Sequence, residues 1–240
     1  MFFRRDKQTN NLTDTMKTLA TSVMATLLVC GSLLTGCLTP AKFDIAVADN
    51  IALRSPKKIK TNEYVSVTSP LLTGNDQVSE SIRTRKVLPL VVYWRFDEIF
   101  TCTLNPKIPI DNFTSAIFSA ANKSLKEKLA GKKLELVVEK VPNVFSMRDR
   151  THLVMVAMYP VHWSTVALLT ENTDLTVAYK LLEGGVEAKQ GRITIPYAKD
   201  KNYLGFFQSW QKGVSEHLGQ YETNIAAMSK SFIDALAKEL

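Results

Sequence analysis

The sequence predicts an α+β fold, a mostly antiparallel sheet with two amphipathic helices packed on one face. Branched and aromatic residues dominate several short segments after residue 87, which favours strands. Apolar residues recur at helical spacing in two places, once between the strand segments and once at the end of the chain. An order of strand, helix, several strands and helix allows both apolar helix faces to be buried on one sheet.

The first strand region covers residues 87–104 and contains the segments VLPLVVYWRF and EIFTCTL. We expect either one long bent strand or a hairpin that turns at Asp97–Glu98. Asp111 then predicts the N-cap of a helix, because a carboxylate is stabilised at the positive start of a helix. The apolar residues of this helix run from Phe113 to Leu129, and Gly131 predicts its end.

Further strands are expected in the middle of the chain. Residues 134–141 read LELVVEKV, and residues 151–163 read THLVMVAMYPVHW, which is apolar on both faces. The second pattern predicts a central strand, or a strand pair broken at its proline. Residues 175–181 alternate cleanly and lead into Gly184-Gly185, which predicts a hairpin with residues 186–197 as its second strand.

The end of the chain gives the strongest helical signal. Apolar residues step by four and three, which predicts a helix over residues 215–238 with one buried face and with His217 on its charged side. Residues 203–213 predict a separate short helix, because two glycines weaken a continuous one. The aromatic residues of this segment are expected either in the core, which is the favoured interpretation, or on an interaction surface. They are Tyr203, Phe206, Phe207 and Trp210.

Composition divides the chain into three parts. Residues 1–36 predict a signal peptide, residues 37–86 a tether with a possible edge strand, and residues 87–240 the α+β domain. Removal of the first part leaves roughly 200 residues, enough for one sizeable core. The tether holds two basic clusters, residues 54–60 and 83–86. We interpret them as solvated charges that keep the tether extended; the alternative is contact with anionic lipid headgroups.

The first part has the regions of a secretory signal peptide. Arg4, Arg5 and Lys7 give a positive start, an apolar run follows over residues 19–34, and small residues close it. Met16 is an alternative start that would make the signal more compact. The apolar run falls short of the roughly 20 residues that a membrane-spanning helix needs, so a retained transmembrane anchor is the weaker alternative.

The apolar run ends in Leu34-Thr35-Gly36-Cys37, which resembles the lipobox of bacterial lipoprotein precursors. The resemblance implies cleavage between Gly36 and Cys37, a diacylglycerol on the Cys37 thiol and an N-acyl chain on the new amino terminus; no other cofactor is expected. Several chains give durable attachment, because each buried methylene contributes about 0.8 kcal/mol. Leu38 follows where an aspartate would resemble an inner-membrane retention signal, so we expect the outer membrane, facing the periplasm. An ordinary signal peptide cut elsewhere is the alternative.

The remaining residues form no catalytic or metal-binding pattern. Cys30 leaves with the signal peptide and Cys37 is acylated, so Cys102 is left without a disulfide partner and is expected as a buried, inert thiol rather than a reactive one. The three histidines lack metal-ligand spacing, and no phosphate loop or nucleophile elbow occurs. We predict no catalytic residues, no metal and no enzymatic activity. The net charge of +7 is mild and does not call for nucleic acid.

The lipobox, the strand–helix–strand order and the closing segment YETNIAAMSKSFIDALAKEL together resemble the ABC-type transport auxiliary lipoproteins. That resemblance implies a protein without an active site that docks a transport partner in the periplasm. We therefore expect a membrane-anchored periplasmic lipoprotein, a non-catalytic accessory subunit of an envelope transport or assembly system with an envelope protein as partner. The alternative is a carrier of a lipid or other hydrophobic ligand, which the aromatic segment beside a sheet suggests.

Overall fold

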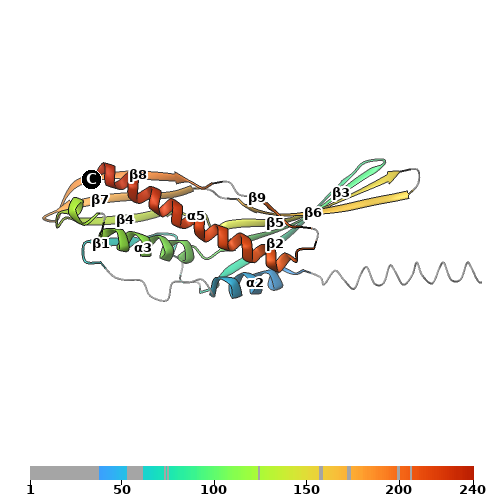
Figure 1. The fold of residues 1–240 in the computed structure, drawn as a ribbon, viewed down its shortest axis with the longest axis horizontal. Helices are drawn as coiled ribbons and strands as arrows, with labels where there is room; N and C mark the ends of the chain where they lie inside the picture. The colour runs from blue at the N-terminus through green and yellow to red at the C-terminus, as the bar shows by residue number, and fades with distance from the viewer. Residues whose placement is uncertain are drawn as a thin grey trace, which may run out of the picture. The chain divides into compact units, whose positions relative to one another are not determined.

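The computed structural model describes residues 38–52, 62–72, 74, 76–123, 125–156, 159–171, 174–198, 201–205 and 207–240. The chain divides into two compact units, Met1–Thr39 and Pro40–Leu240, and the elements labelled in Figure 1 belong to the second. Its described residues form four helices and nine strands in two mostly antiparallel sheets, which confirms the α+β class. The expectation of a single sheet is wrong, because the strands are shared between two.

The five-stranded sheet is antiparallel throughout and has the order β2–β3–β5–β6–β9. Its strands are β2 (Ser79–Pro89), β3 (Tyr93–Leu104), β5 (Val144–Val156), β6 (Tyr159–Thr170) and β9 (Lys201–Tyr203). β2 and β3 form a hairpin that turns at residues 90–92, whereas Asp97 and Glu98 lie within β3 and not in a turn. β5 and β6 form the second hairpin, which confirms the strand pair of the two alternatives. The expected break at the proline is wrong, because Pro160 lies within β6 and pairs with Met155.

The four-stranded sheet has the order β1–β4–β7–β8, with β1 parallel to β4 and the other pairs antiparallel. Its strands are β1 (Val65–Thr68), β4 (Lys133–Lys140), β7 (Asp174–Glu183) and β8 (Val186–Pro196). The hairpin predicted around Gly184-Gly185 is confirmed. Both glycines have positive φ angles, 60° and 87°, a backbone conformation in which a Cβ atom is strained.

The last helix, α5 (Trp210–Glu239), packs against strands of both sheets (Figure 1). Its 30 residues extend about 45 Å at about 1.5 Å per residue. The predicted separate helix over residues 203–213 is wrong, because β9 occupies its start and α5 continues through Gly213. A Cβ at Gly213 would lie 2.9 Å from the Leu204 side chain, so the glycine permits a close approach of the two segments.

The buried face of α5 is wider than its apolar stripe. His217 is buried, and its ring lies 5.2 Å from that of Phe145, centroid to centroid. The expectation of His217 on the charged side of the helix is therefore wrong. Helix α2 (Pro40–Ala52) contacts the same part of α5, and elements on two sides of a helix bury more than one stripe.

Helix α2 and strands β1 and β2 lie in the region predicted to be a tether, so residues 37–86 are not a simple spacer. Phe43, Val47 and Ile51, one turn apart, form the buried face of α2. The Phe43 ring lies 5.8 Å from Phe100, 6.0 Å from Phe145 and 6.0 Å from Trp210. Since these partners come from three other elements, α2 is part of the core of this unit.

Helix α3 (Lys107–Ala121) begins one turn earlier than predicted, so Asp111 is not its N-cap. Asn105 and Pro106 start the helix: the Asn105 side chain accepts a hydrogen bond of 3.0 Å from the Lys107 N–H. Asp111 instead forms an ion pair with Lys107 one turn away. The predicted helix to Leu129 is interrupted and resumes as α4 (Lys126–Leu129), which ends at Ala130 with φ 46°.

Candidate functional site

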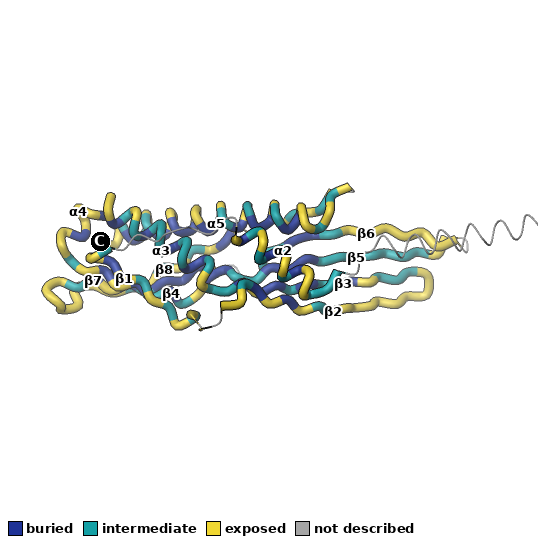
Figure 2. The backbone as a smooth tube through the Cα atoms, turned by 90° about the horizontal axis from the view of Figure 1, so that it is seen from below, coloured by how far each residue is buried: buried dark blue, intermediate teal, exposed yellow. Residues whose placement is uncertain are grey.

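The most unusual surface of the described residues is one end of the five-stranded sheet, hereafter the sheet end. It comprises residues 83–99 of β2, β3 and their turn, and residues 148–156 and 159–165 of β5 and β6. Figure 1 shows β3, β5 and β6 continuing past the starts of α2 and α5, and Figure 2 shows the outer parts of β2 and β6 largely exposed. A sheet normally buries at least one face, so this end is uncovered on both sides where a core would be expected.

The two hairpins of the sheet end are joined side by side. In the register of β3 and β5, Tyr93 pairs with Val154 and Trp94 pairs with Leu153. Beyond the last pair, the backbone N–H of Met155 donates a hydrogen bond of 3.0 Å to the carbonyl of Val92. The turn after β2 is therefore fixed to β5, and the two hairpins form one continuous surface.

The outermost residues of the sheet end are apolar and exposed. Val91 is 93% exposed and Tyr159 is 76% exposed. Other large apolar residues with substantial exposure lie around them: Val87, Leu88, Leu90, Val92, Phe96, Met155, Val156, Val161 and Trp163. Soluble monomers rarely expose contiguous apolar patches beyond a few hundred Å², and larger patches mark sites of contact with proteins, ligands or membranes.

Both sides of the sheet end hold ordered side-chain clusters. On one side, Tyr93 Oη lies 2.7 Å from His152 Nδ1, and the His152 ring stacks on Trp163 with centroids 4.9 Å apart. Cross-strand neighbours share a face, so Arg95, which pairs with His152, belongs to the same side. These contacts hold the aromatic rings in place on an otherwise open sheet.

Asp97 is buried in the next row of the same side. Arg150 Nε donates a hydrogen bond of 2.7 Å to one carboxylate oxygen, and Arg95 Nε lies 3.2 Å from the other. Burial alone would raise the pKa of Asp97, but the hydrogen bond and charge of Arg150, aided by Arg95, hold this pKa below its ordinary value. The carboxylate therefore remains charged between two arginines.

The opposite side carries a second cluster around Glu98. Arg83 forms an ion pair with Glu98, and Arg85 Nε lies 3.1 Å from the same carboxylate oxygen. Asp149 lies opposite Glu98 in the strand register and is itself half-buried. Burial is the main cause that raises the pKa of Asp149, and the negative charge of Glu98 raises it further. A pocket of about 360 Å³ lies over this cluster, lined by Arg85, Lys86, Val87, Phe96, Asp97, Glu98, Asp149 and Thr151.

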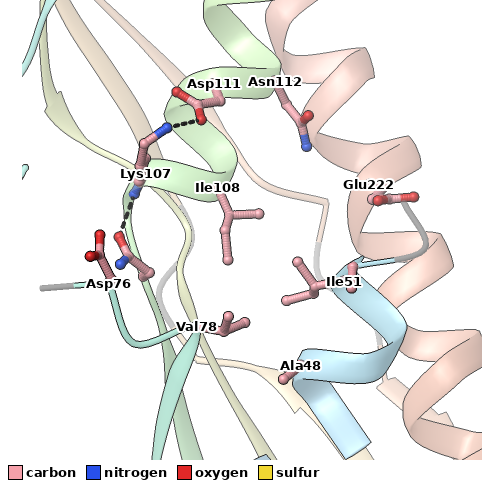
Figure 3. Close-up of a pocket in the computed structure, with 11 residues that line it drawn as sticks. Ala48, Ile51, Asp76, Val78, Lys107, Ile108, Asp111, Asn112 and Glu222 are labelled. Carbon is pink, nitrogen blue, oxygen red and sulfur yellow. Dashed lines mark hydrogen bonds and ion pairs between the residues drawn. The ribbon is translucent and has the colours of Figure 1, made fainter. Parts of the chain in front are cut away.

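A second pocket lies between α2, α3, α5 and the chain that leads into β2 (Figure 3). Ala48, Ile51, Val78 and Ile108 give it an apolar wall, while Asp76, Asp111, Asn112 and Glu222 supply polar groups. Its volume is about 260 Å³. Sites for drug-sized ligands usually have about 300–1,000 Å³, so the pocket has no room for a lipid with long acyl chains.

The aromatic segment predicted as a possible interaction surface is divided by the structure. Tyr203 and Phe207 are exposed, Phe207 by 96%, and Lys201 Nζ lies 4.6 Å from the centre of the Tyr203 ring. Trp210 instead is half-buried and packs against the core residue Phe43. Phe206 lies outside the described residues, as do Gly36 and Cys37, the predicted cleavage and lipidation residues.

Cys102 is buried, as predicted. It lies in β3 among the aromatic residues of the core, and burial raises the pKa of its thiol to about 12. The thiolate is the reactive form of cysteine, so this residue is chemically quiet in the folded protein.

Comparison of the chain with protein-family models, curated proteins and solved structures gives no match. No helix within the described ranges is both long and apolar enough to cross a bilayer. In the same part of the chain, no three or more His, Cys, Asp or Glu side chains gather where they could hold a metal ion.

The sheet end is the candidate functional surface that the sequence prediction missed. Its signal is present in two charge-free apolar runs, VLPLVVYW over residues 87–94 and LVMVAMYPV over residues 153–161. A strand that is apolar on both faces is typical of the buried centre of a sheet. Interpreted in this way, the two runs give no indication that their side chains are exposed. The turn at residues 90–92 is itself apolar and lacks the Gly or Asn that marks most tight turns.

Proposed function

We propose that this protein is a lipid-anchored, non-catalytic accessory protein of an envelope transport or assembly system, which acts by contact through its sheet end. The observation that supports this function best is the sheet end itself. Four strands project apolar and aromatic side chains on both faces, with ordered polar clusters behind them. Such a surface is suited to binding another envelope component rather than to transforming a small molecule.

The proposed anchor is Cys37, at the end of Leu34-Thr35-Gly36-Cys37. Two residues, Leu38 and Thr39, lie between Cys37 and Pro40, where α2 starts, and three Cα–Cα steps span at most about 11 Å. Phe43 in the first turn of α2 packs against Phe100, which directly follows the β3 part of the sheet end. An acyl chain on Cys37 would therefore hold the base of the sheet end close to a membrane surface.

Intact-mass analysis and fractionation test the anchor. We expect the native protein to begin at Cys37, to carry the mass of three acyl chains and to sediment with the outer membrane. Cys37→Ala should release the protein from that fraction, whereas Cys102→Ala, as the matched control, should leave it there. An unmodified amino terminus would remove the anchor from the proposal.

Crosslinking in whole cells tests the contact surface. A photoreactive residue at Val91 should give discrete products with other envelope components, lipid or protein, while the same residue at Val186, the first residue of β8 after the β7–β8 turn, should not. Val186 is a matched control because it is also a valine beside a hairpin turn and is 72% exposed. Equal crosslinking at both positions would contradict a role for the sheet end.

A further inference from the structure

Charged and apolar residues are segregated along the strands of the sheet end. Residues 87–94 and 153–161, which form the outer parts of the two hairpins, contain no charged residue. The basic residues begin directly behind them. They are Arg83, Arg85, Lys86, Arg95, Arg148 and Arg150, against the acidic residues Asp97, Glu98, Asp149 and Glu171, the last of which forms an ion pair with Arg148.

The strand register fixes this order in space. Lys86, Asp97 and Arg150 form one row across β2, β3 and β5. The next row outward on the same face of the sheet holds Arg95, His152 and, on β6, Trp163. Further out, all side chains except that of His162, which pairs with Leu153, are apolar or aromatic. Side-chain chemistry therefore changes with distance along the strands, from a net positive belt through aromatic rings to an apolar tip.

This order matches the layers of a membrane surface. Basic side chains favour anionic headgroups, Trp and Tyr favour the interface, and apolar side chains favour the acyl chains. A protein-binding patch has a different plan, in which an apolar centre is ringed on all sides by polar residues. The belt at the sheet end lies on one side only, behind the apolar tip.

We propose that the component bound by the sheet end is an anionic lipid surface. The inference rests on the proposed function, since it names the partner of the same contact surface. The tip extends about 10 Å beyond Arg95, at about 3.4 Å per residue, and interfacial elements are buried to a depth of about 5–10 Å. The basic belt then lies at the headgroups while the tip reaches the start of the acyl chains.

The open edges of the sheet end limit the depth of insertion. Among the described residues, no strand pairs with the outer edge of β2. On the other side of the sheet, β9 covers only residues 167–169 of β6, so within the described part of the chain residues 159–165 pair with β5 alone and their outer edge is open. Unpaired backbone groups are costly in hydrocarbon, so the sheet end is suited to the interface and not to the bilayer interior. The lipid on Cys37 and the sheet end would act on the same membrane.

A fluorescent probe on the tip tests this inference. The mature, acylated protein is reconstituted in vesicles of phosphatidylcholine, with or without phosphatidylglycerol, and an environment-sensitive maleimide is attached through Val91→Cys. Cys102 does not compete for the label because it is buried. Val186→Cys is the matched control. We expect a blue shift and at least twofold quenching by brominated acyl chains at position 91 on the anionic vesicles, and neither at position 186.

Two further variants test the belt and the joined tips. Lys86→Glu should reduce the blue shift at position 91 severalfold on anionic vesicles and leave neutral vesicles unaffected. Val91→Asp should abolish the shift of a probe at Tyr159→Cys, since the two hairpins form one surface. Val91 is almost fully exposed, so this variant should retain the unfolding midpoint of the parent protein.

The outcomes separate the inference from the proposed function. A probe at position 91 that remains in water on both vesicle types overturns the lipid inference. A blue shift at position 91 that appears only when envelope proteins are added, or only when more copies of this protein are present per vesicle, also overturns the lipid inference. The proposed function then stands, with a protein as the partner of the sheet end. An unacylated Cys37 together with a blue-shifted tip removes the anchor alone and supports binding of lipid by the sheet end.

Discussion

Ser81 Oγ donates a hydrogen bond of 2.6 Å to Asp44, which joins the first turns of α2 to the strand β2. The same carboxylate accepts hydrogen bonds from Ser79 Oγ at 2.8 Å and from the Ser81 backbone N–H at 3.1 Å. Ser79 and Ser81 are buried, and the helix supplies the charged acceptor for these polar groups. This contact attaches the segment after Cys37 to the sheet.

Asp44→Ala should lower the free energy of unfolding by about 2–3 kcal/mol, because it leaves buried donors without their charged acceptor. Chemical denaturation of the purified protein measures this change. Asp49→Ala is the matched control, since Asp49 is exposed on the same helix and its loss should change stability by less than about 0.5 kcal/mol. Equal effects of the two substitutions would contradict the role given to Asp44.

Asp97→Asn should destabilise the protein at neutral pH and reduce its sensitivity to acid. The pKa of Asp97 is lower in the folded protein than in the unfolded chain, so its ionisation stabilises the fold above the unfolded pKa of about 3.9. That contribution is lost as the pH falls through the folded pKa. Unfolding measured from pH 7 to pH 3 should therefore show a smaller loss for the variant; parallel curves would argue against the pairing with Arg150.

Asp149→Asn should have the opposite effect. Burial and Glu98 raise the pKa of Asp149 above its unfolded value, so the ionised group destabilises the fold at neutral pH, and this penalty disappears as the pH falls below the unfolded pKa. The variant should be more stable than the parent at pH 7 and lose this advantage near pH 3. A variant less stable at pH 7 would show that the Asp149 carboxylate has a stabilising partner.

Cys102 should resist thiol reagents until the protein unfolds. With a pKa of about 12 it has very little thiolate at pH 8, and its reaction should be slower than that of an unfolded cysteine on the order of a thousandfold. Kinetics of reaction with a colorimetric disulfide reagent, with and without denaturant, measure the ratio. Rapid reaction of the native protein would show that the core opens around Phe100 and Phe145.

The elements with strong local patterns could be predicted from the sequence. The β7–β8 hairpin has clean alternation and two glycines with positive φ, and α5 has a long apolar stripe. α2 was not predicted, because its buried face is a short signal of only three residues, Phe43, Val47 and Ile51, directly before the polar and basic segment of residues 54–60. β2 shows no apolar alternation at its start, where the buried positions are Ser79 and Ser81, and their burial depends on Asp44 from a distant segment.

The sheet end could not be predicted for a different reason. Hydrophobic periodicity shows which side chains are apolar but not whether another element covers them. Phe100 and Phe96 lie on the same face of β3, yet Phe100 is buried under Phe43 whereas Phe96 is exposed. The difference arises from where α2 and α5 begin, which is a property of the tertiary arrangement.

The length of α5 has a consequence for how the protein unfolds. The two sheets have no strand in common among the described residues, and α5 contacts β6 of one and β8 of the other. Near the carboxyl end of α5, Glu239 forms an ion pair of 3.0 Å with Lys189 of β8. In the amino-terminal half of α5, the His217 ring packs against Phe145 of β5. The helix thus couples the unfolding of two sheets that share no strand. A proline in the middle of α5 would split the single cooperative unfolding transition of this unit into two.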